Sequence, residues 1–503
     1  MSRVNIIGAG LAGLSAAVAL AEREIPCALI SCQSSERAQS VLAEGGINAA
    51  LDVMGENDSP AEHYSDTMRG GCDLADPNAV RGLTEHAPEI VRRLLDIGVP
   101  FQMEGGTLIQ RNFGGQKKKR TAYAKSSTGK AIMTALIDEA RKYEALGLIC
   151  RYPHHELKEA LLSEGACRGA AVRNCWGGEL LRFPGPVILA LGGMNGLFPG
   201  RTTGTTQNSG DALAALFAQG LPLANLEMIQ YHPTTAAISG KRLLVSEAAR
   251  GEGGRLFVLH NGERRYFMEE RYPQEGNLAP RDVISREMAG LGNDPTYLDL
   301  TGLSGTVWAR RLPDLRRELR HYLGIDPAKA PIPVQPGIHF FMGGIMVDEG
   351  HHTGIPGLLA AGECACQYHG ANRLGGNSLL GAIYGGLVAA ESAASMASED
   401  MEPTPLETGR EEAADAAFSE RLGEILYAGL GILRDEAGLC SALAALDALE
   451  GEAHTKRNRQ RLMLGRAMLL SALARRESRG AHTRTDYPTR DDERYRKTTV
   501  AVC

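Results

Sequence analysis

Three glycines near the N-terminus have the spacing that binds the phosphates of a dinucleotide. Gly8, Gly10 and Gly13 form a G-x-G-x-x-G pattern. In such a pattern the first glycine allows a tight turn, the second lets a pyrophosphate approach the backbone, and the third lets a helix pack closely on a strand. The N-terminus of the following helix offers unpaired N–H groups and a positive dipole to the phosphates. These residues therefore predict a bound dinucleotide.

The segments on both sides of the glycines agree with this prediction. Residues 3–7 are typical of a buried parallel strand, an Ala-rich helix follows to about Arg23, and residues 27–31 read as a second strand. An acidic residue usually ends the second strand and binds the ribose of the dinucleotide. Ser31 and Cys32 stand there instead. The ribose contacts must therefore be arranged differently in this protein.

The composition is that of a large globular protein and excludes several functions. The chain has 503 residues, of which 43% are hydrophobic and 23% charged. A formal net charge of −6 gives no reason to expect nucleic-acid binding. The sequence contains no apolar run of about 20 residues, the length needed to cross a membrane. We also expect no signal peptide, because the N-terminus begins with a strand and lacks a basic leader. We expect a cytoplasmic protein that reaches the inner membrane only through a partner, without direct membrane insertion.

The ten cysteines do not predict a metal site. They are scattered along the chain, without the C-x-x-C pairs of zinc or iron–sulfur proteins. Cys364 and Cys366 are the closest pair and lie in a Gly-rich stretch. We interpret the cysteines as small buried side chains of a reducing cytosol. Because the chain has no cluster motif of its own, any reductase activity needs an external electron carrier.

A series of motifs in a fixed order extends along nearly the whole chain. It begins with VLAEGGINAA at residues 41–50 and continues with RNFGG at 111–115, QYHPT at 230–234 and HFFMGG at 339–344. The other members lie at residues 66–71, 120–121, 128–129, 246–254, 280–282, 369–378, 477–482 and 490–492. In this order the motifs resemble the succinate dehydrogenase and fumarate reductase flavoprotein family, which includes L-aspartate oxidase. The resemblance is strongest to the fumarate reductase flavoprotein subunit.

The resemblance implies an α/β fold in three parts. A Rossmann-like FAD-binding domain would comprise residues 1–225 and 336–398. An α+β capping domain at residues 226–335 would be inserted into it, and residues 399–503 would form a helical C-terminal domain and tail. Regular spacing of Ala, Leu, Glu and Arg in the last part favours helices.

The resemblance also implies the FAD contacts. A helix beginning at Asn377 and Ser378, with Ser378 as its N-cap, would direct its positive end at the flavin ring. The residues expected to contact the cofactor are Gly8, Gly10, Gly13, Ser31, Ser40, Glu44, Gly45, Gly46, Asp211, Glu363, Asn377, Ser378 and Leu379.

The position of Gln39 predicts that FAD is bound non-covalently. In respiratory members of the family a His at this position carries a covalent flavin bond, which an amide cannot form. Since the covalent bond raises the flavin potential in the family, its absence favours fumarate reduction over succinate oxidation.

The substrate implied by the resemblance is a C4 dicarboxylate. His232, Ser246, His339 and Arg373 would bind its carboxylates, since guanidinium grips a carboxylate with two parallel hydrogen bonds. Arg281 would donate the proton, although a guanidine with a pKa above about 12 is a poor acid unless burial and neighbouring charge assist it. Glu247 and Arg250, one helical turn apart, would relay protons to Arg281.

Three alternatives remain open from the sequence. The first is L-aspartate oxidase, which shares the fold and the clamps, and which residues 246–250 favour. The second is a reductase of another unsaturated acid, because Phe340 and Phe341 are bulky and apolar beside His339. The third is an electron-transfer subunit that is inactive without an iron–sulfur partner.

Overall fold

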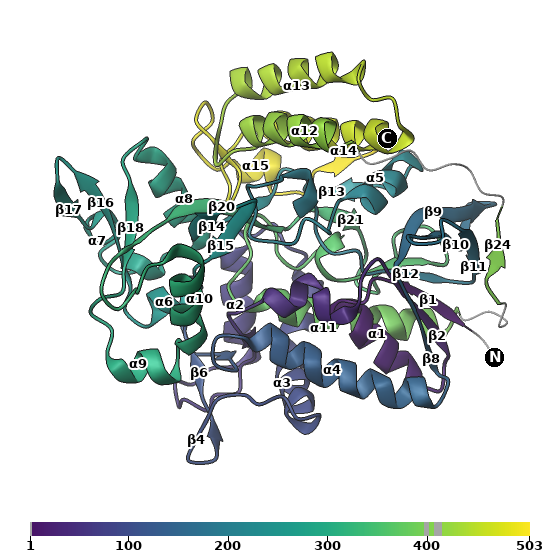
Figure 1. The fold of residues 1–503 in the computed structure, drawn as a ribbon, viewed down its shortest axis with the longest axis horizontal. Helices are drawn as coiled ribbons and strands as arrows, with labels where there is room; N and C mark the ends of the chain where they lie inside the picture. Colours follow the sequence, from purple (N-terminus) through teal and green to yellow (C-terminus); the bar gives the residue numbers. More distant parts are fainter. Residues whose placement is uncertain (1–2, 397–401, 407–414) are drawn as a thin grey trace.

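The computed structural model describes residues 3–396, 402–406 and 415–503. It is a mixed α/β fold, as the sequence predicts. Figure 1 shows a nucleotide-binding part around β1 and α1, a lobe that carries β16 to β18 and α8 to α10, and a layer of helices formed by α12, α13 and α14.

A five-stranded parallel sheet forms the centre of the nucleotide-binding part. Its order is β22-β12-β1-β2-β8, and all four neighbouring pairs are parallel. The strands span Leu358–Ala360, Val187–Leu189, Val4–Ile7, Cys27–Ser31 and Ile149–Pro153 in that order. Strand β22 therefore joins strands that lie more than 150 residues earlier, as a split domain requires.

Helix α1 (Leu11–Ala21) is buried along its whole length because small side chains let it pack tightly. A Cβ atom on Gly13 would lie 1.8 Å from the Gly8 carbonyl oxygen, and one on Gly8, whose φ is 119°, would lie 2.0 Å from that of Ala190. Only glycine fits at these two positions. Helices α3 (Pro77–Asp96), α4 (Thr128–Ala145) and α11 (Asn377–Ala394) share one hydrophobic core with α1.

The predicted N-cap of α11 is wrong. The helix begins at Asn377, and its N-cap is Gly376, with a φ of 85° and no side-chain cap. Ser378 is the second residue of the helix. A Cβ atom at position 376 would lie 2.1 Å from the Asn48 Oδ1 atom, so a tertiary contact decides the residue at the cap.

The inserted lobe has its own hydrophobic core. Its chain enters through β14 (Ile229–Ile238) and leaves through β20 (Gln335–Phe341), which pair with each other. The lobe further contains β15 (Lys241–Leu244), α6 (Glu247–Gly251), β16 (Arg255–His260), β17 (Glu263–Arg265), α8 (Arg281–Gly290), β18 (Thr296–Asp299), α10 (Pro313–Leu323) and β19 (Ile332–Pro333). This core supports our proposal that residues 226–335 form a capping domain.

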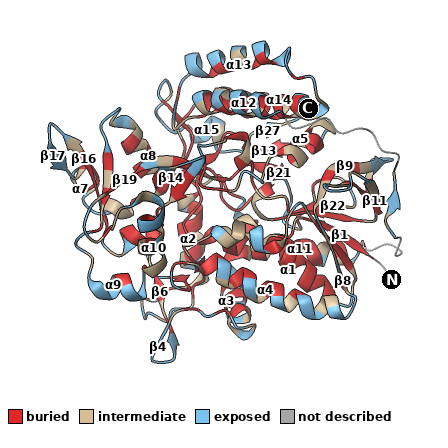
Figure 2. Ribbon diagram, viewed as in Figure 1, coloured by how far each residue is buried: buried red, intermediate tan, exposed pale blue. Residues whose placement is uncertain are grey.

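The C-terminal helices do not form a separate core. Helices α12 (Ala416–Gly429), α13 (Glu436–Glu450) and α14 (Lys456–Ala474) pack with α5 (Asp211–Ala218). Their buried residues belong to one cluster with those of the antiparallel sheet β9 (His155–Ser163), β10 (Ala166–Asn174), β11 (Leu180–Pro184) and β24 (Thr404–Pro405). Figure 2 shows exposed residues along the outer face of α13, and a mixture of buried and exposed residues in α12 beneath it. We propose that residues 399–503 form one unit, of which the described residues pack on the nucleotide-binding part; its expected first residues, 399–401, lie outside the described residues.

Shorter elements complete the fold. In the sheet β23-β21-β13-β27, the C-terminal strand β27 pairs with β13. The remaining elements are β3 (Ile47–Asn48), α2 (Pro60–Gly70), β4 (Met103–Glu104), β5 (Thr107–Leu108), β6 (Gln110–Arg111), β7 (Thr121–Ala122), β13 (Leu223–Ala224), α7 (Phe267–Arg271), α9 (Gly305–Arg310), β21 (Gly344–Met346), β23 (Ala365–Cys366), β25 (Leu433–Arg434), β26 (Thr483–Arg484), α15 (Asp492–Tyr495) and β27 (Val500–Ala501). Within the described residues, no helix combines the length and apolar character needed to span a membrane.

Candidate active site and cofactor cavity

One cavity of about 550 Å³ lies between the nucleotide-binding part and the capping lobe. This volume is in the usual range for ligand and cofactor sites. All of the residues expected to contact cofactor or substrate line it, except Gly13, Asp211, Asn377 and Arg250. The expected residues that do line it are Gly8, Gly10, Ser31, Ser40, Glu44, Gly45, Gly46, His232, Ser246, Glu247, Arg281, His339, Glu363, Arg373, Ser378 and Leu379.

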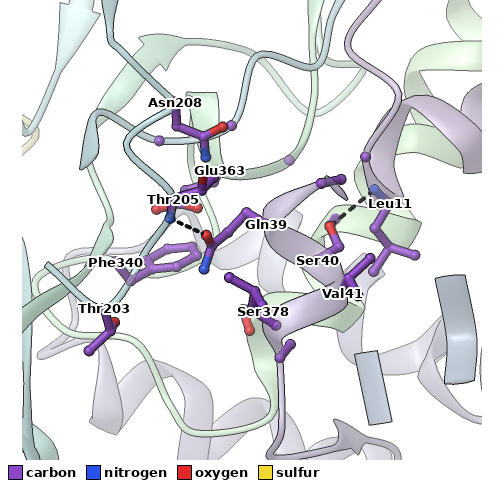
Figure 3. Close-up of a pocket in the computed structure, with 18 of the residues that line it drawn as sticks. Leu11, Gln39, Ser40, Val41, Thr203, Thr205, Asn208, Phe340, Glu363 and Ser378 are labelled. Atoms are coloured by element: carbon purple, nitrogen blue, oxygen red, sulfur yellow. Dashed lines mark hydrogen bonds between the residues drawn. The ribbon is translucent and has the colours of Figure 1, made fainter. Parts of the chain in front are cut away.

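The wall formed by the nucleotide-binding part suits a dinucleotide. The N-termini of α1 and α11 both open on the cavity, so backbone N–H groups and positive helix dipoles face it. Ser40 lies beside the first of these ends, where its hydroxyl accepts a hydrogen bond from the Leu11 N–H at 3.2 Å (Figure 3). A Cβ atom on Gly46, whose φ is 144°, would lie 2.5 Å from the Ala122 carbonyl oxygen. The two helix N-termini fit a group with phosphates, and the tight packing of Gly46 on Ala122 fixes the loop beside them.

Gln39 ties a loop of the nucleotide-binding part to the cavity. Its side-chain oxygen accepts a hydrogen bond from the Thr205 N–H at 2.6 Å, and both residues line the cavity (Figure 3). The loop that contains Thr203, Thr205 and Asn208 lies between β12 and α5. The amide of Gln39 therefore has a structural partner at the position where the sequence predicts no covalent flavin bond.

Three of the residues expected to bind the cofactor do not line the cavity. Gly13 packs against Gly8, as described above. Asn377 is held by Asn48, His63 and Thr67. Asp211 does not line the cavity, although its neighbours Gly210 and Ala212 do, and its carboxylate is bound by Arg457 and Arg461 of α14. These ion pairs anchor the helical layer at the start of α5.

Arg281 is held by two side chains of the capping lobe. Its guanidinium donates to the Glu247 carboxylate through Nε at 2.8 Å and Nη2 at 2.7 Å, and to the Gln230 side-chain oxygen at 3.1 Å. The other oxygen of Glu247 accepts from the Gly114 N–H at 2.6 Å. Arg250 lies one turn along α6, with its Nη2 atom 3.9 Å from the Glu247 Oε1 atom. Glu247 therefore connects both arginines to the nucleotide-binding part.

The two histidines and Arg373 complete the polar wall. The rings of His232 and His339 are 5.1 Å apart, and their Nδ1 atoms contact the Thr234 carbonyl oxygen at 3.2 Å and the Thr203 hydroxyl at 2.8 Å. Arg373 lies over the Phe340 ring at 4.5 Å, and its buried Nε atom has no partner. Positively charged and hydrogen-bonding groups thus converge on the space between them.

Phe340 and Phe341 point to different sides of β20, and only one of them lies at the cavity. Phe340 lines the cavity under Arg373. Phe341 is buried and stacks on Phe198 at 5.9 Å, away from the cavity lining. Only Phe340 therefore shapes the site.

The electrostatics of the site favour an anionic ligand. Burial, and then the charges of Arg281 and its neighbours, hold the pKa of His232 and that of His339 well below the ordinary value. Burial followed by Arg281 also lowers the pKa of Arg373. Burial opposes ionisation of Glu247, but Arg281 and Arg250 outweigh it, so its pKa is lowered and it stays charged. Three guanidinium groups therefore lie near the single carboxylate of Glu247. A bound anion would offset the repulsion among their positive charges.

Two other carboxyl groups of the cavity are biased toward their neutral forms. Burial, and then the charge of Glu318, hold the pKa of Glu44 well above its ordinary value, although the Ser246 hydroxyl bonds to it. Burial raises the pKa of Glu363 to about 7, against the hydrogen bond from the Phe341 N–H at 3.1 Å. At neutral pH both groups therefore carry less negative charge than an ordinary carboxylate.

The sequence did not predict several of the residues that line the cavity. Gly192 and Gly193 follow β12, and a glycine pair after a buried strand could have indicated them. Thr203, Ser126, Ser127 and Lys130 carry no local signal, because tertiary packing alone brings them to the cavity. Lys241 and Arg317 add positive charge from the capping lobe.

Comparisons with known proteins agree with this geometry. Residues 3–379 match the model of the FAD binding domain family, and residues 453–503 match that of the fumarate reductase flavoprotein C-terminus. The succinate dehydrogenase flavoprotein subunit of Bacillus subtilis is 36% identical over 99% of this chain and 94% of its own length. L-aspartate oxidase of Streptomyces coelicolor is 34% identical over 99% of this chain and 90% of its own.

A solved structure leads to the same family. A mutant of FrdA from E. coli quinol fumarate reductase has a TM-score of 0.89 and 30% identity, covering 100% of this chain and 94% of its own. The chain is therefore an FAD-dependent oxidoreductase that belongs to the succinate dehydrogenase and fumarate reductase flavoprotein family.

Proposed function

We propose that this flavoprotein interconverts fumarate and succinate, with fumarate reduction favoured. The observation that carries this proposal is the cluster of Arg281, Arg250 and Arg373 around the single charged carboxylate of Glu247, at a cavity shared by cofactor and substrate residues. A dianionic substrate balances this excess of positive charge.

The substrate carboxylates would be bound from two sides. Arg373 offers its unpartnered guanidinium N–H, which is suited to a carboxylate. His232 and Ser246 come from the capping lobe, whereas His339 comes from β20, at the strand pair that joins the two parts. Binding between them excludes water and aligns one substrate carbon with the cofactor.

The chemistry is the addition of a hydride and a proton across the double bond of fumarate. FAD, when bound and first reduced with two electrons from the electron partner, would supply the hydride to one carbon. Arg281 would give a proton from a terminal guanidinium nitrogen to the other carbon, so that the dianion of succinate is formed. Glu247 orients that guanidinium through two hydrogen bonds and links it to Arg250, which would return the proton.

We also propose that FAD is held non-covalently. The Gln39 side chain cannot form the covalent bond that a His would, and it is already bonded to the Thr205 N–H. Acid precipitation of the purified protein should therefore release all of its flavin into the supernatant. Flavin that stays with the precipitate would contradict this part of the proposal.

An electron partner is part of the proposal. Relatives of this chain carry names of flavoprotein subunits, among them one of 8-methylmenaquinol:fumarate reductase. Within the described residues, no group of three or more His, Cys, Asp or Glu side chains could hold a metal ion. We propose a cytoplasmic subunit that receives electrons from an iron–sulfur partner, and that approaches the inner membrane through that partner alone.

The second candidate function is L-aspartate oxidation, which the 34% identity to an L-aspartate oxidase favours. The α-ammonium group of aspartate needs a negative partner near the reacting carbon. Glu247 is engaged by Arg281 and the Gly114 N–H, and Glu44 and Glu363 have raised pKa values. The site therefore suits a dicarboxylate without an ammonium group better than aspartate.

Single-turnover kinetics test the proposal. The protein's flavin is reduced anaerobically, fumarate is added, and the visible flavin absorbance is followed. Rapid reoxidation by fumarate that is lost in Arg281→Gln is the expected result. Bleaching of the oxidised flavin by L-aspartate, with no response of the reduced flavin to fumarate, would make the protein an aspartate oxidase instead.

A further inference from the structure

The end of β2 lacks the acidic side chain that usually binds the ribose of a dinucleotide in this fold. Ser31 ends the strand, and its hydroxyl donates to the Gln33 carbonyl oxygen at 2.6 Å. Cys32 follows, and a thiol is a weak hydrogen-bonding group. Both residues line the cavity, so the ribose must pass close to them. A carboxylate that serves it has to come from another element.

The backbone brings Glu156 to this place. Ser31 pairs with Pro153 at the end of β8, and the chain then turns through His154, whose φ is 60°, into β9. Glu156 is the second residue of β9 and lines the cavity together with Ser31 and Cys32. The carboxylate lies close enough to influence Cys32. Burial of the Cys32 thiol is the first cause that raises its pKa, and the negative charge of Glu156 is the second.

The other carboxyl groups of the cavity lie elsewhere or are already bonded. Glu247 binds Arg281, and Glu363 accepts from the Phe341 N–H. Glu44 and Glu318 influence each other at the capping-lobe end of the cavity. Glu156 therefore remains as the carboxylate beside the end of β2. Lys158, two residues along the same strand, donates to its Oε2 atom at 2.9 Å and fixes the orientation of the carboxylate.

We propose that Glu156 binds the adenosine ribose hydroxyls of FAD, from β9, in place of an acid at the end of β2. A carboxylate accepts hydrogen bonds from two neighbouring hydroxyls, and such charge-assisted bonds are strong. This role concerns cofactor binding only, so it holds whichever reaction the site performs.

The test compares FAD with an analogue that lacks the adenosine 2′-hydroxyl. Both are titrated into the flavin-free full-length chain, and the dissociation constants are read from flavin fluorescence. The wild-type chain should prefer FAD by about tenfold, the worth of one hydrogen bond to a charged group. In Glu156→Gln, FAD should bind about tenfold or more weakly, and the preference for FAD over the analogue should fall severalfold.

Glu159→Gln is the matched control. Glu159 lies on the same strand but not at the cavity, is half-buried and contacts the exposed Lys456 at 3.5 Å. This variant should keep both dissociation constants and the preference. Equal weakening of FAD and the analogue in Glu156→Gln would overturn the proposal, because Glu156 would then act only through Lys158. Loss of the preference in Ser31→Ala but not in Glu156→Gln would also overturn it and assign the ribose to Ser31.

Discussion

Arg281 and Glu247 form a buried ion pair between the first residues of two helices of the capping lobe, with 2.7 Å between Nη2 and Oε2. Glu247 suits the positive N-terminus of α6, whereas Arg281 places a cation at the positive N-terminus of α8. Without Glu247, the helix dipole and the neighbouring arginines would all oppose the charge of Arg281. The pair therefore holds the buried guanidinium of Arg281 at the cavity.

Replacing Arg281 by Gln should strongly lower the rate of fumarate reduction, while the folded protein keeps its bound flavin. Loss of a general acid typically lowers the rate by about 10²- to 10⁴-fold. The reoxidation rate of the reduced flavin by fumarate measures this loss, and the flavin content shows that the cavity is intact. Arg286→Gln, on the same helix and outside the cavity lining, is the control. Equal losses in both variants would show that α8, rather than Arg281, is at fault.

Glu247→Gln should lower the rate while retaining FAD. The amide oxygen can still accept from the Gly114 N–H, but the charge that holds Arg281 is lost. We expect a decrease of about 10²-fold, within the range for one group of a proton-transfer chain. The decrease should appear in kcat more than in KM, because Glu247 is proposed to act through Arg281. A change confined to KM would place Glu247 in substrate binding instead.

Dicarboxylate binding should weaken as the pH rises. In the empty site the pKa values of His232 and His339 are depressed, so both rings are neutral at neutral pH. A bound dianion raises these pKa values, so binding takes up protons and is favoured where protons are abundant. Malonate should bind severalfold more tightly at about pH 6 than at about pH 8, the range in which His ordinarily titrates.

Calorimetry in buffers of different ionisation enthalpy can count the protons taken up with malonate. His339→Asn should reduce both the proton uptake and the pH dependence. Binding that is independent of pH, without proton uptake, would show that the histidines stay neutral in the complex.

Asp314 should help to hold the capping lobe against the nucleotide-binding part. Its Oδ2 atom accepts hydrogen bonds from the hydroxyls of Ser126 and Ser127 at 3.1 and 3.2 Å, beside the cavity. Asp314→Ala should raise KM for fumarate severalfold and make the flavin fluorescence more sensitive to quenching by iodide. The control is Asp326→Asn, because Asp326 bonds to Arg316 within the lobe. Equal quenching in wild type and Asp314→Ala would argue against this contact as a support of closure.

Short-range patterns predicted much of this protein. Gly8, Gly10 and Gly13 indicated the phosphate-binding turn by their spacing alone. In the structure a Cβ atom on Gly13 would clash with the nearby Gly8 carbonyl oxygen and one on Gly8 with the distant Ala190 carbonyl oxygen, whereas one on Gly10 would meet no atom closer than 3.5 Å. The ordered motifs placed His232, Arg281, His339 and Arg373 in one site, and all four line the cavity. The N-cap rule failed at Ser378, since contact with the distant Asn48 requires glycine at position 376.

The sequence by itself determined the α/β class, the FAD-binding turn and most of the side chains that meet at the cavity. Only the tertiary structure decided that Asp211 bonds to α14, that the C-terminal helices share a core with the antiparallel sheet, and that Glu156 lies beside Ser31. Turns and helix spacing depend on neighbours along the chain and can be predicted locally. These other contacts join residues more than 100 positions apart, and they exist only because whole elements pack against one another.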